Sequence, residues 1–257
     1  MRLLGSGSTS EVYDLGDNRI LKLYFPGAVE KMRHEMEVYR YLAQARLPVF
    51  SLEGTMEHSG RDGLVFGRSV IGPTIRQVLL RSPWRAAEMG RLLARLHLRV
   101  HEEMAPMLPA FSKVINKFSR GRDKLSLDQV NKLEARLNAL PAGDTLCHGD
   151  FHLSNVILHK NEGWIIDWAR AGKGSPMCDL AKSFLTYKPT KKVPWLRRSL
   201  QLPLRLLVRE TYLNSYLKAA NFNFSDFKNF IEPLEADYLL KYWSLHRDEI
   251  DRKINLL

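Results

Sequence analysis

The chain has 257 residues, of which 45% are hydrophobic and 26% charged. This composition is that of a globular protein with one large domain or two lobes, and it argues against a disordered or collagen-like chain. No apolar run approaches the ~20 residues that span a bilayer, and no secretory signal is recognisable. Two cysteines, Cys147 and Cys178, cannot form a disulfide framework, so we expect a reducing, cytoplasmic environment.

The net charge of +11 is concentrated in one segment. Residues 180–210 contain one acid, Glu210, and eight basic residues: Lys182, Lys188, Lys191, Lys192, Arg197, Arg198, Arg205 and Arg209. Such a segment attracts phosphates, nucleic acid or acidic lipids. Residues 188–209 also carry Trp and Leu and could contact an anionic membrane surface. Because Pro194 and Pro203 are expected to break a long amphipathic helix, we favour a core-packing segment with a basic outer face.

The first 75 residues have the pattern of a small sheet with one helix. Residues 11–14 and 19–24 are predicted strands that flank the turn residues 16–18. Residues 28–45 lack Gly and Pro and are predicted to be helical, and residues 63–70 are a further predicted strand.

The chain becomes mainly helical after Gly72-Pro73. One helix is expected to start at Ser82-Pro83, as an N-cap and first-turn pair, and a capping box of Ser126 with Gln129 predicts another. The expected exceptions are two paired strands, at residues 155–159 and 163–167, before a helical remainder from Pro176. We therefore predict a β-rich lobe at residues 1–70 that binds nucleotide, and a helical lobe at residues 71–257 with the catalytic loop and the substrate site.

Three polar side chains carry the strongest chemical signal. Asp150 precedes Asn155 by five residues, and Asp167 closes the strand that pairs with the one opened by Asn155. A hairpin with these bounds places Asn155 and Asp167 at the same end of the ladder, where an amide and a carboxylate oxygen suit Mg²⁺. Asp150, on the loop before them, is then the base for an incoming hydroxyl. This set of groups is typical of phosphoryl transfer.

The N-terminal sequence adds an independent signal. The glycine-rich run of Gly5, Ser6, Gly7 and Ser8 fits a loop whose backbone N–H groups approach phosphates, although a plain hairpin tip would have the same pattern. Lys22 lies in an apolar strand and needs a partner. Glu35, on the apolar stripe of the next helix, is the preferred partner over Glu30 and Glu37.

The order of these elements resembles the protein-kinase-like fold, an α+β bilobal architecture. His148-Gly149-Asp150 stands where protein kinases have His-Arg-Asp, and Ile166-Asp167-Trp168 where they have Asp-Phe-Gly; Ser10 replaces a third loop glycine. Together with Asp179-Leu-Ala and the run from Arg33 to Leu42, these features are similar to the aminoglycoside phosphotransferase and choline kinase family. The resemblance covers nearly the whole chain.

The resemblance implies a role for each matching position. Asp150 would be the catalytic base, and Asn155 with Asp167 would bind Mg²⁺. Lys22, paired with Glu35, would bind nucleotide phosphates under the loop that begins at Gly5. The remaining implied roles are a hinge to the adenine at Arg68, Ser69 and Val70, and a structural role for Asp179, which would hold the catalytic loop.

The expected activity is transfer of the γ-phosphoryl group of ATP or GTP to a hydroxyl of a small molecule: an antibiotic, a sugar or another metabolite. The hinge lacks the acid that many relatives carry, so the choice of ATP over GTP stays open. The alternatives are a nucleotide-binding pseudokinase acting as an interaction module, and an atypical protein Ser/Thr kinase. The short segment between Asp167 and Asp179 argues against the latter. Nucleic acid is the least favoured partner, because no recognition module for it is present.

Overall fold

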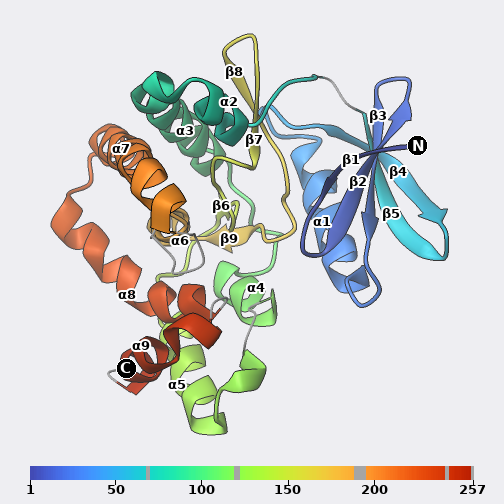
Figure 1. Ribbon diagram of the computed structural model, residues 1–257. Coiled ribbons are helices and arrows are strands. Elements are labelled where there is room, and N and C mark those ends of the chain that lie inside the picture. Colours follow the sequence, from blue (N-terminus) through green and yellow to red (C-terminus); the bar gives the residue numbers. More distant parts are fainter. Residues whose placement is uncertain (68–69, 119–121, 188–194, 241–242, 256–257) are drawn as a thin grey trace. The chain divides into compact units, whose positions relative to one another are not determined.

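The computed structural model describes residues 1–67, 70–118, 122–187, 195–240 and 243–255. The chain divides into two compact units, each formed by two stretches of sequence (Figure 1). Unit 1 comprises Met1–Val78 and Leu153–Ala171, and unit 2 comprises Leu79–His152 and Gly172–Leu257. The predicted lobe boundary after residue 70 stays a prediction.

Unit 1 contains a five-stranded antiparallel sheet in the order β1-β2-β3-β5-β4. Its strands are β1 (Arg2–Ser6), β2 (Ser10–Gly16), β3 (Arg19–Tyr24), β4 (Ser51–His58) and β5 (Arg61–Gly67). Helix α1 (Val29–Leu42) packs against β4 and β5. The hairpin predicted around residues 16–18 is confirmed, since Asp17 and Asn18 both adopt the positive φ of a tight primed turn. The last four residues of β3 are buried, so this central strand carries its side chains into the interior on both faces.

The second stretch of unit 1 forms the hairpin of β7 (Val156–His159) and β8 (Glu162–Ile165). The predicted strand pair is therefore confirmed, although each strand is shorter than expected. Main-chain hydrogen bonds join this hairpin to the first stretch: Leu158 N–H donates to the Pro73 carbonyl at 2.8 Å, and Ile165 N–H to the Pro48 carbonyl at 2.8 Å. The hairpin is thus part of the same folded body as the five-stranded sheet.

Unit 2 is mainly helical (Figure 1). Its helices are α3 (Ala86–His101), α4 (Phe111–Phe118), α5 (Leu127–Asn138), α6 (Pro176–Leu185), α7 (Trp195–Ala219), α8 (Phe224–Leu240) and α9 (Trp243–Asn255); α2 (Ile75–Arg81) begins in unit 1 and ends in unit 2. Two short strands, β6 (Thr145–Cys147) and β9 (Gly172–Gly174), pair antiparallel. The longest helix, α7, lies along α3.

Close contact between α3 and α7 depends on Gly90. A Cβ atom at this position would lie 2.8 Å from Cβ of Thr211 and 2.9 Å from the carbonyl oxygen of Val208. Because one of these is a backbone atom of α7, it cannot move aside without shifting the helix. Glycine at this position therefore lets α3 and α7 pack closely. Most of the buried side chains of α3 follow Gly90 along the helix.

Two expectations about helix boundaries are corrected by the structure. Ser82 makes no side-chain capping bond; it precedes a short 3-10 turn (Pro83–Arg85), after which α3 begins. Pro203 does not end a helix, since α7 runs through it over 25 residues. The capping box of Ser126 and Gln129 is confirmed, with both reciprocal bonds formed.

The basic segment at 180–210 is only partly a surface feature. Lys182 is buried, 3.5 Å from the carboxylate of Asp237. Arg205 donates to the Thr186 carbonyl, and Arg209 stacks on Phe184. The other basic residues of the segment, Lys188, Lys191, Lys192, Arg197 and Arg198, lie outside the described residues or have side chains that are not described. No helix in the described ranges is long and apolar enough to span a membrane.

Candidate functional site

Lys22 is the centre of a buried charge cluster in unit 1. Its Nζ lies 2.9 and 2.7 Å from the two carboxylate oxygens of Glu35, and 2.7 Å from Oδ1 of Asp167. The predicted pairing of Lys22 with Glu35 is therefore confirmed, and the structure adds Asp167 to it. Strand β3, helix α1 and the segment after β8 each contribute one member. The rival acids Glu30 and Glu37 are exposed on the other side of α1.

The charges of this cluster stabilise one another. Burial lowers the pKa of Lys22, but the carboxylates of Asp167 and Glu35 outweigh it and raise that pKa, so the amine stays protonated at neutral pH. Burial raises the pKa of Glu35 and Lys22 opposes this. The Tyr24 hydroxyl also hydrogen-bonds Glu35, and burial raises the pKa of Tyr24. The phenol is therefore a permanent donor to the carboxylate.

Asp167 differs from its two partners because it is accessible. Its side chain is 43% exposed, whereas that of Glu35 is 1% exposed. The residue has φ 66°, a left-handed conformation that is uncommon outside glycine and is found at functional sites. Such a conformation turns the chain directly after β8.

Asn155 and Asp167 lie at the same end of the β7–β8 hairpin, as predicted. Val156 pairs with Ile165, and Ile166 N–H donates to the Asn155 carbonyl at 3.0 Å. Asp167 is two residues beyond the strand rather than its last member. A carboxylate and an amide oxygen in this position are hard ligands of the kind that Mg²⁺ prefers, so the donor set fits that ion.

The glycine-rich loop joins β1 to β2. Gly5, Ser6, Gly7 and Ser8 are all exposed, and Gly7 N–H donates to the Ser10 carbonyl at 2.8 Å. A Cβ atom at Gly5 would meet nothing within 4 Å, and one at Gly7 only the Ser10 carbonyl at 3.5 Å. The fold of unit 1 alone therefore does not require glycine at either position.

The loop that carries Asp150 belongs to unit 2 and is fixed on both sides of this residue. Before it, Gly149 has φ 79° and donates its N–H to Oδ1 of Asp179 at 2.9 Å. After it, Phe151 is fully buried and stacks on His97, with ring centroids 4.2 Å apart. Asp150 N–H donates to Nδ1 of His148 at 3.2 Å. The Asp150 side chain remains 23% exposed between these anchors.

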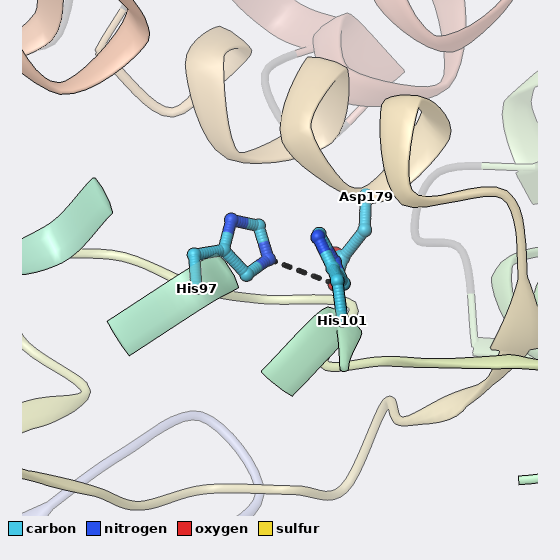
Figure 2. A group of neighbouring side chains, drawn as sticks. All are labelled: His97, His101 and Asp179. Carbon is cyan, nitrogen blue, oxygen red and sulfur yellow. Dashed lines mark hydrogen bonds and ion pairs between the residues drawn. The ribbon is translucent and has the colours of Figure 1, made fainter. Parts of the chain in front are cut away.

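Asp179, on α6, is the anchor of this loop, and its implied structural role agrees with the hydrogen bonds. Its Oδ2 accepts the His148 N–H at 2.5 Å. Two histidines of α3 also contact Oδ2 through their Nε2 atoms, His97 at 3.0 Å and His101 at 3.3 Å (Figure 2). Although burial opposes it, interaction with these histidines keeps the pKa of Asp179 well below its ordinary value. Burial, with His101, lowers the pKa of His97 to about 3.

Some predicted site residues lie outside the described part of the chain, and some residues of the site were not predicted. Arg68 and Ser69 of the predicted hinge lie outside the described residues, and Val70 is buried. Sequence analysis did not identify Tyr24, although its spacing of two from Lys22 on one strand was a signal. Nor did it identify His97 and His101, whose spacing of four on a helix places them on one face.

The family of the chain follows from its sequence. A model of the phosphotransferase enzyme family, APH, matches residues 1–217, which include every predicted site residue. The chain belongs to this family. A curated relative, Acyl-CoA dehydrogenase family member 11 of Mus musculus, is 36% identical over 70 residues, and these are 25% of this chain. The match spans only 9% of the length of that relative.

Solved structures of other phosphotransferases share the fold. Aminoglycoside phosphotransferase APH(2'')-Ib, bound to ADP, has a TM-score of 0.57 at 15% identity and is matched over 99% of this chain and 90% of its own. A thermostable mutant of APH(4)-Ia has a TM-score of 0.61 at 15% identity, over 98% and 90%. Aminoglycoside-3'-phosphotransferase of type VIII has a TM-score of 0.60 at 19% identity, over 91% and 90%. The predicted α+β kinase-like fold is thus confirmed.

Proposed function

We propose that this phosphotransferase transfers the γ-phosphoryl group of ATP, or of GTP, to a hydroxyl of a small molecule. The observation that carries the proposal is the cluster of Lys22, Glu35 and Asp167. It holds a cation and an accessible carboxylate side by side in one compact unit. Phosphoryl transfer requires little else than such positioning and charge stabilisation.

Each residue then has a separate task. Lys22 binds nucleotide phosphates while Glu35 and Tyr24 orient its ammonium. Gly5 to Ser8 cover the phosphates, which explains two glycines that the fold of unit 1 alone does not require. Asn155 and Asp167 would hold Mg²⁺, an ion that neutralises developing phosphate charge when bound. Solved relatives contain ADP or AMP-PNP, which supports a nucleotide donor.

Asp150 is the proposed base for the acceptor hydroxyl. It belongs to unit 2, whereas Asn155 belongs to unit 1, and four residues separate the two along the chain. The bonds from Asp179 and the burial of Phe151 fix the backbone on both sides of Asp150.

The acceptor is proposed as a sugar, an antibiotic or another metabolite with a free hydroxyl. Solved relatives include complexes with hygromycin B and with gentamicin. An aminoglycoside is a polycation and needs free carboxylates. Two acids of the C-terminal region are already engaged in this chain: Asp237 with Lys182, and Glu235 with Lys253. These two carboxylates are therefore not free to bind a cationic acceptor.

Calorimetric titration of ATP and GTP, with and without Mg²⁺, tests the proposal. We expect Mg²⁺-dependent binding to the native chain and its loss in Asp167→Ala. An ADP-release screen of sugars, amino alcohols and antibiotics follows, with Asp150→Asn as the control that binds nucleotide but does not turn over. No binding of either nucleotide by folded protein would refute the proposal. Binding without Asp150-dependent turnover of any acceptor would instead favour a nucleotide-binding interaction module.

A further inference from the structure

A second group of ligand-bearing side chains lies in unit 2, apart from the residues assigned to phosphoryl transfer. His97 and His101 project from α3 toward Asp179 on α6 (Figure 2). Their Nε2 atoms and one Asp179 carboxylate oxygen all lie within 4.8 Å of one another. The side chains of His97 and Asp179 are fully buried, and that of His101 is 4% exposed. Two imidazoles and a carboxylate therefore converge here in the protein interior, away from bulk water.

The distances between these atoms match those of a tetrahedral metal centre. Bonds of about 2.0–2.1 Å to zinc place two ligand atoms about 3.3 Å apart. Oδ2 of Asp179 lies 3.0 Å from Nε2 of His97 and 3.3 Å from Nε2 of His101. A spacing of four residues puts both imidazoles on one face of α3. The two distances to Oδ2 are thus each within a few tenths of an ångström of the ligand separation that a bound zinc ion would set.

The second ring nitrogen of each histidine has the kind of hydrogen-bond partner that a metal-ligating histidine requires. Nδ1 of His97 lies 2.5 Å from the Tyr212 hydroxyl, and Nδ1 of His101 lies 2.5 Å from the Tyr216 hydroxyl. Each phenol oxygen can accept the Nδ1 proton, which leaves the Nε2 lone pair directed at the metal. Both tyrosines come from α7, which Gly90 allows to approach α3 closely.

The hydrogen bonds at Asp179 also favour an occupied centre. Without a metal, Oδ2 accepts three donors: Nε2 of His97, Nε2 of His101 and the N–H of His148. An oxygen with two lone pairs is crowded by three donors. A cation bound to both imidazoles would replace two of these contacts by one bond and retain the bond to His148.

We propose that His97, His101 and Asp179 bind a divalent transition-metal ion, with zinc the best match to two imidazoles and one carboxylate. This centre is distinct in chemistry from the proposed Mg²⁺ ligands, which are oxygen atoms only. Because Asp179 also accepts the N–H groups of His148 and Gly149, the metal would stiffen the loop that carries Asp150.

The first test measures metal content and needs no substitution. Tag-free protein, purified without chelator, is analysed by mass spectrometry for zinc, cobalt, nickel and iron; about one zinc per chain is expected. Protein stripped with chelator is then titrated with Co²⁺, which absorbs visible light strongly when tetrahedral and weakly when hydrated. A strong band that saturates at one equivalent supports the centre. A featureless titration of folded protein, with no bound metal, overturns it and leaves a hydrogen-bonded cluster.

Variants assign the ligands. His101→Gln is expected to abolish the Co²⁺ band and the rise in melting temperature that Zn²⁺ produces in the native protein. His58→Gln, at an exposed position on β4, is the matched control and should change neither. Tyr216→Phe should weaken binding about 10- to 100-fold, because it removes only the outer partner of His101. Equal loss in the His58 variant, or a band unchanged in His101→Gln, would refute the assignment. Binding is read without nucleotide, so the result is independent of the proposed phosphotransfer.

Discussion

The ammonium of Lys22 and the carboxylate of Asp167 lie 2.7 Å apart although 145 residues separate them in the chain. The contact unites the central strand of the sheet with the turn after β8. Lys22 and Asp167 are therefore held in position before nucleotide arrives, which lowers the cost of ordering them on binding.

Substitution of Lys22 tests both the catalytic and the structural contribution of this cluster. Lys22→Met is expected to reduce turnover about 10²-fold or more, because it removes a charge that stabilises the transferring group. It should also cost about 3–5 kcal/mol of unfolding free energy, because Glu35 is left buried and unpaired. Urea unfolding and ADP-release rates measure the two effects.

The double variant Lys22→Met/Glu35→Gln provides the internal check. Removing the second charge should restore part of the lost stability without restoring turnover. Lys132→Met, at an exposed pair with Asp128, is the matched control and should be neutral. Recovery of turnover in the double variant would contradict the role assigned to Lys22.

Tyr24→Phe tests the hydroxyl that contacts Glu35. Loss of one donor to a buried carboxylate should cost about 1–3 kcal/mol of unfolding free energy. We also expect weaker nucleotide binding with an unchanged rate at saturation, since Tyr24 acts only through Glu35 and Lys22. Tyr13→Phe removes a similar bond, to the half-buried Glu11, and should cost less. Equal costs in both variants would argue against a special role for Tyr24.

Gly90→Ala should destabilise the protein although alanine is the better helix former. The gain in helix propensity is about 1 kcal/mol, whereas overpacking costs about 1–3 kcal/mol. Because the added Cβ atom would meet the backbone of α7, the overpacking cost should exceed the gain in helix propensity, and the melting temperature should fall. Gly54→Ala, where a Cβ atom meets nothing within 4 Å, is the control for an added methyl group. A higher melting temperature for Gly90→Ala would show that α3 and α7 can move apart.

The two cysteines should be unreactive in the native protein. Burial raises the pKa of Cys178 to about 12 and that of Cys147 well above its ordinary value. At pH 8, the thiolate fraction of Cys178 should therefore be roughly a thousandfold lower than that of a thiol with a pKa of 9. Labelling with a maleimide should be slow in buffer and rapid in denaturant. The thiols of the unfolded chain ionise at a lower pH than those of the folded protein, so the free energy of unfolding should fall as the pH rises above about 9. Rapid labelling of the native protein would contradict the burial of the two cysteines.

The sequence predicted the parts of the site that local patterns determine. Lys22 in an apolar strand required a buried acid, and Glu35 was the acid on the inward face of α1. The turn residues between the strands located the β7–β8 hairpin and so placed Asn155 and Asp167 at one end. These inferences succeeded because each depends on periodicity or on a short turn.

Contacts between distant segments could not be predicted in this way. The sequence predicts a core-packing segment with a basic outer face at 180–210, but nothing local indicates that Lys182 is buried against Asp237. Pro203 was expected to end a helix, but packing of α7 along α3 outweighs the lost hydrogen bond. The positive φ of Asp167 and the convergence of His97 and His101 on Asp179 likewise arise from tertiary structure.

The discontinuity of both units has a consequence for the order in which the chain is synthesised. Unit 1 lacks β7 and β8 until residue 165 has left the ribosome, although its five-stranded sheet is complete by residue 67. The anchors of the Asp150 loop depend on α6, and the tyrosines behind them emerge later still, with α7. A nascent chain of 150 residues therefore presents a sheet with a charged lysine and glutamate but no aspartate opposite them. Such intermediates expose apolar surface and are the stage at which aggregation is most expected.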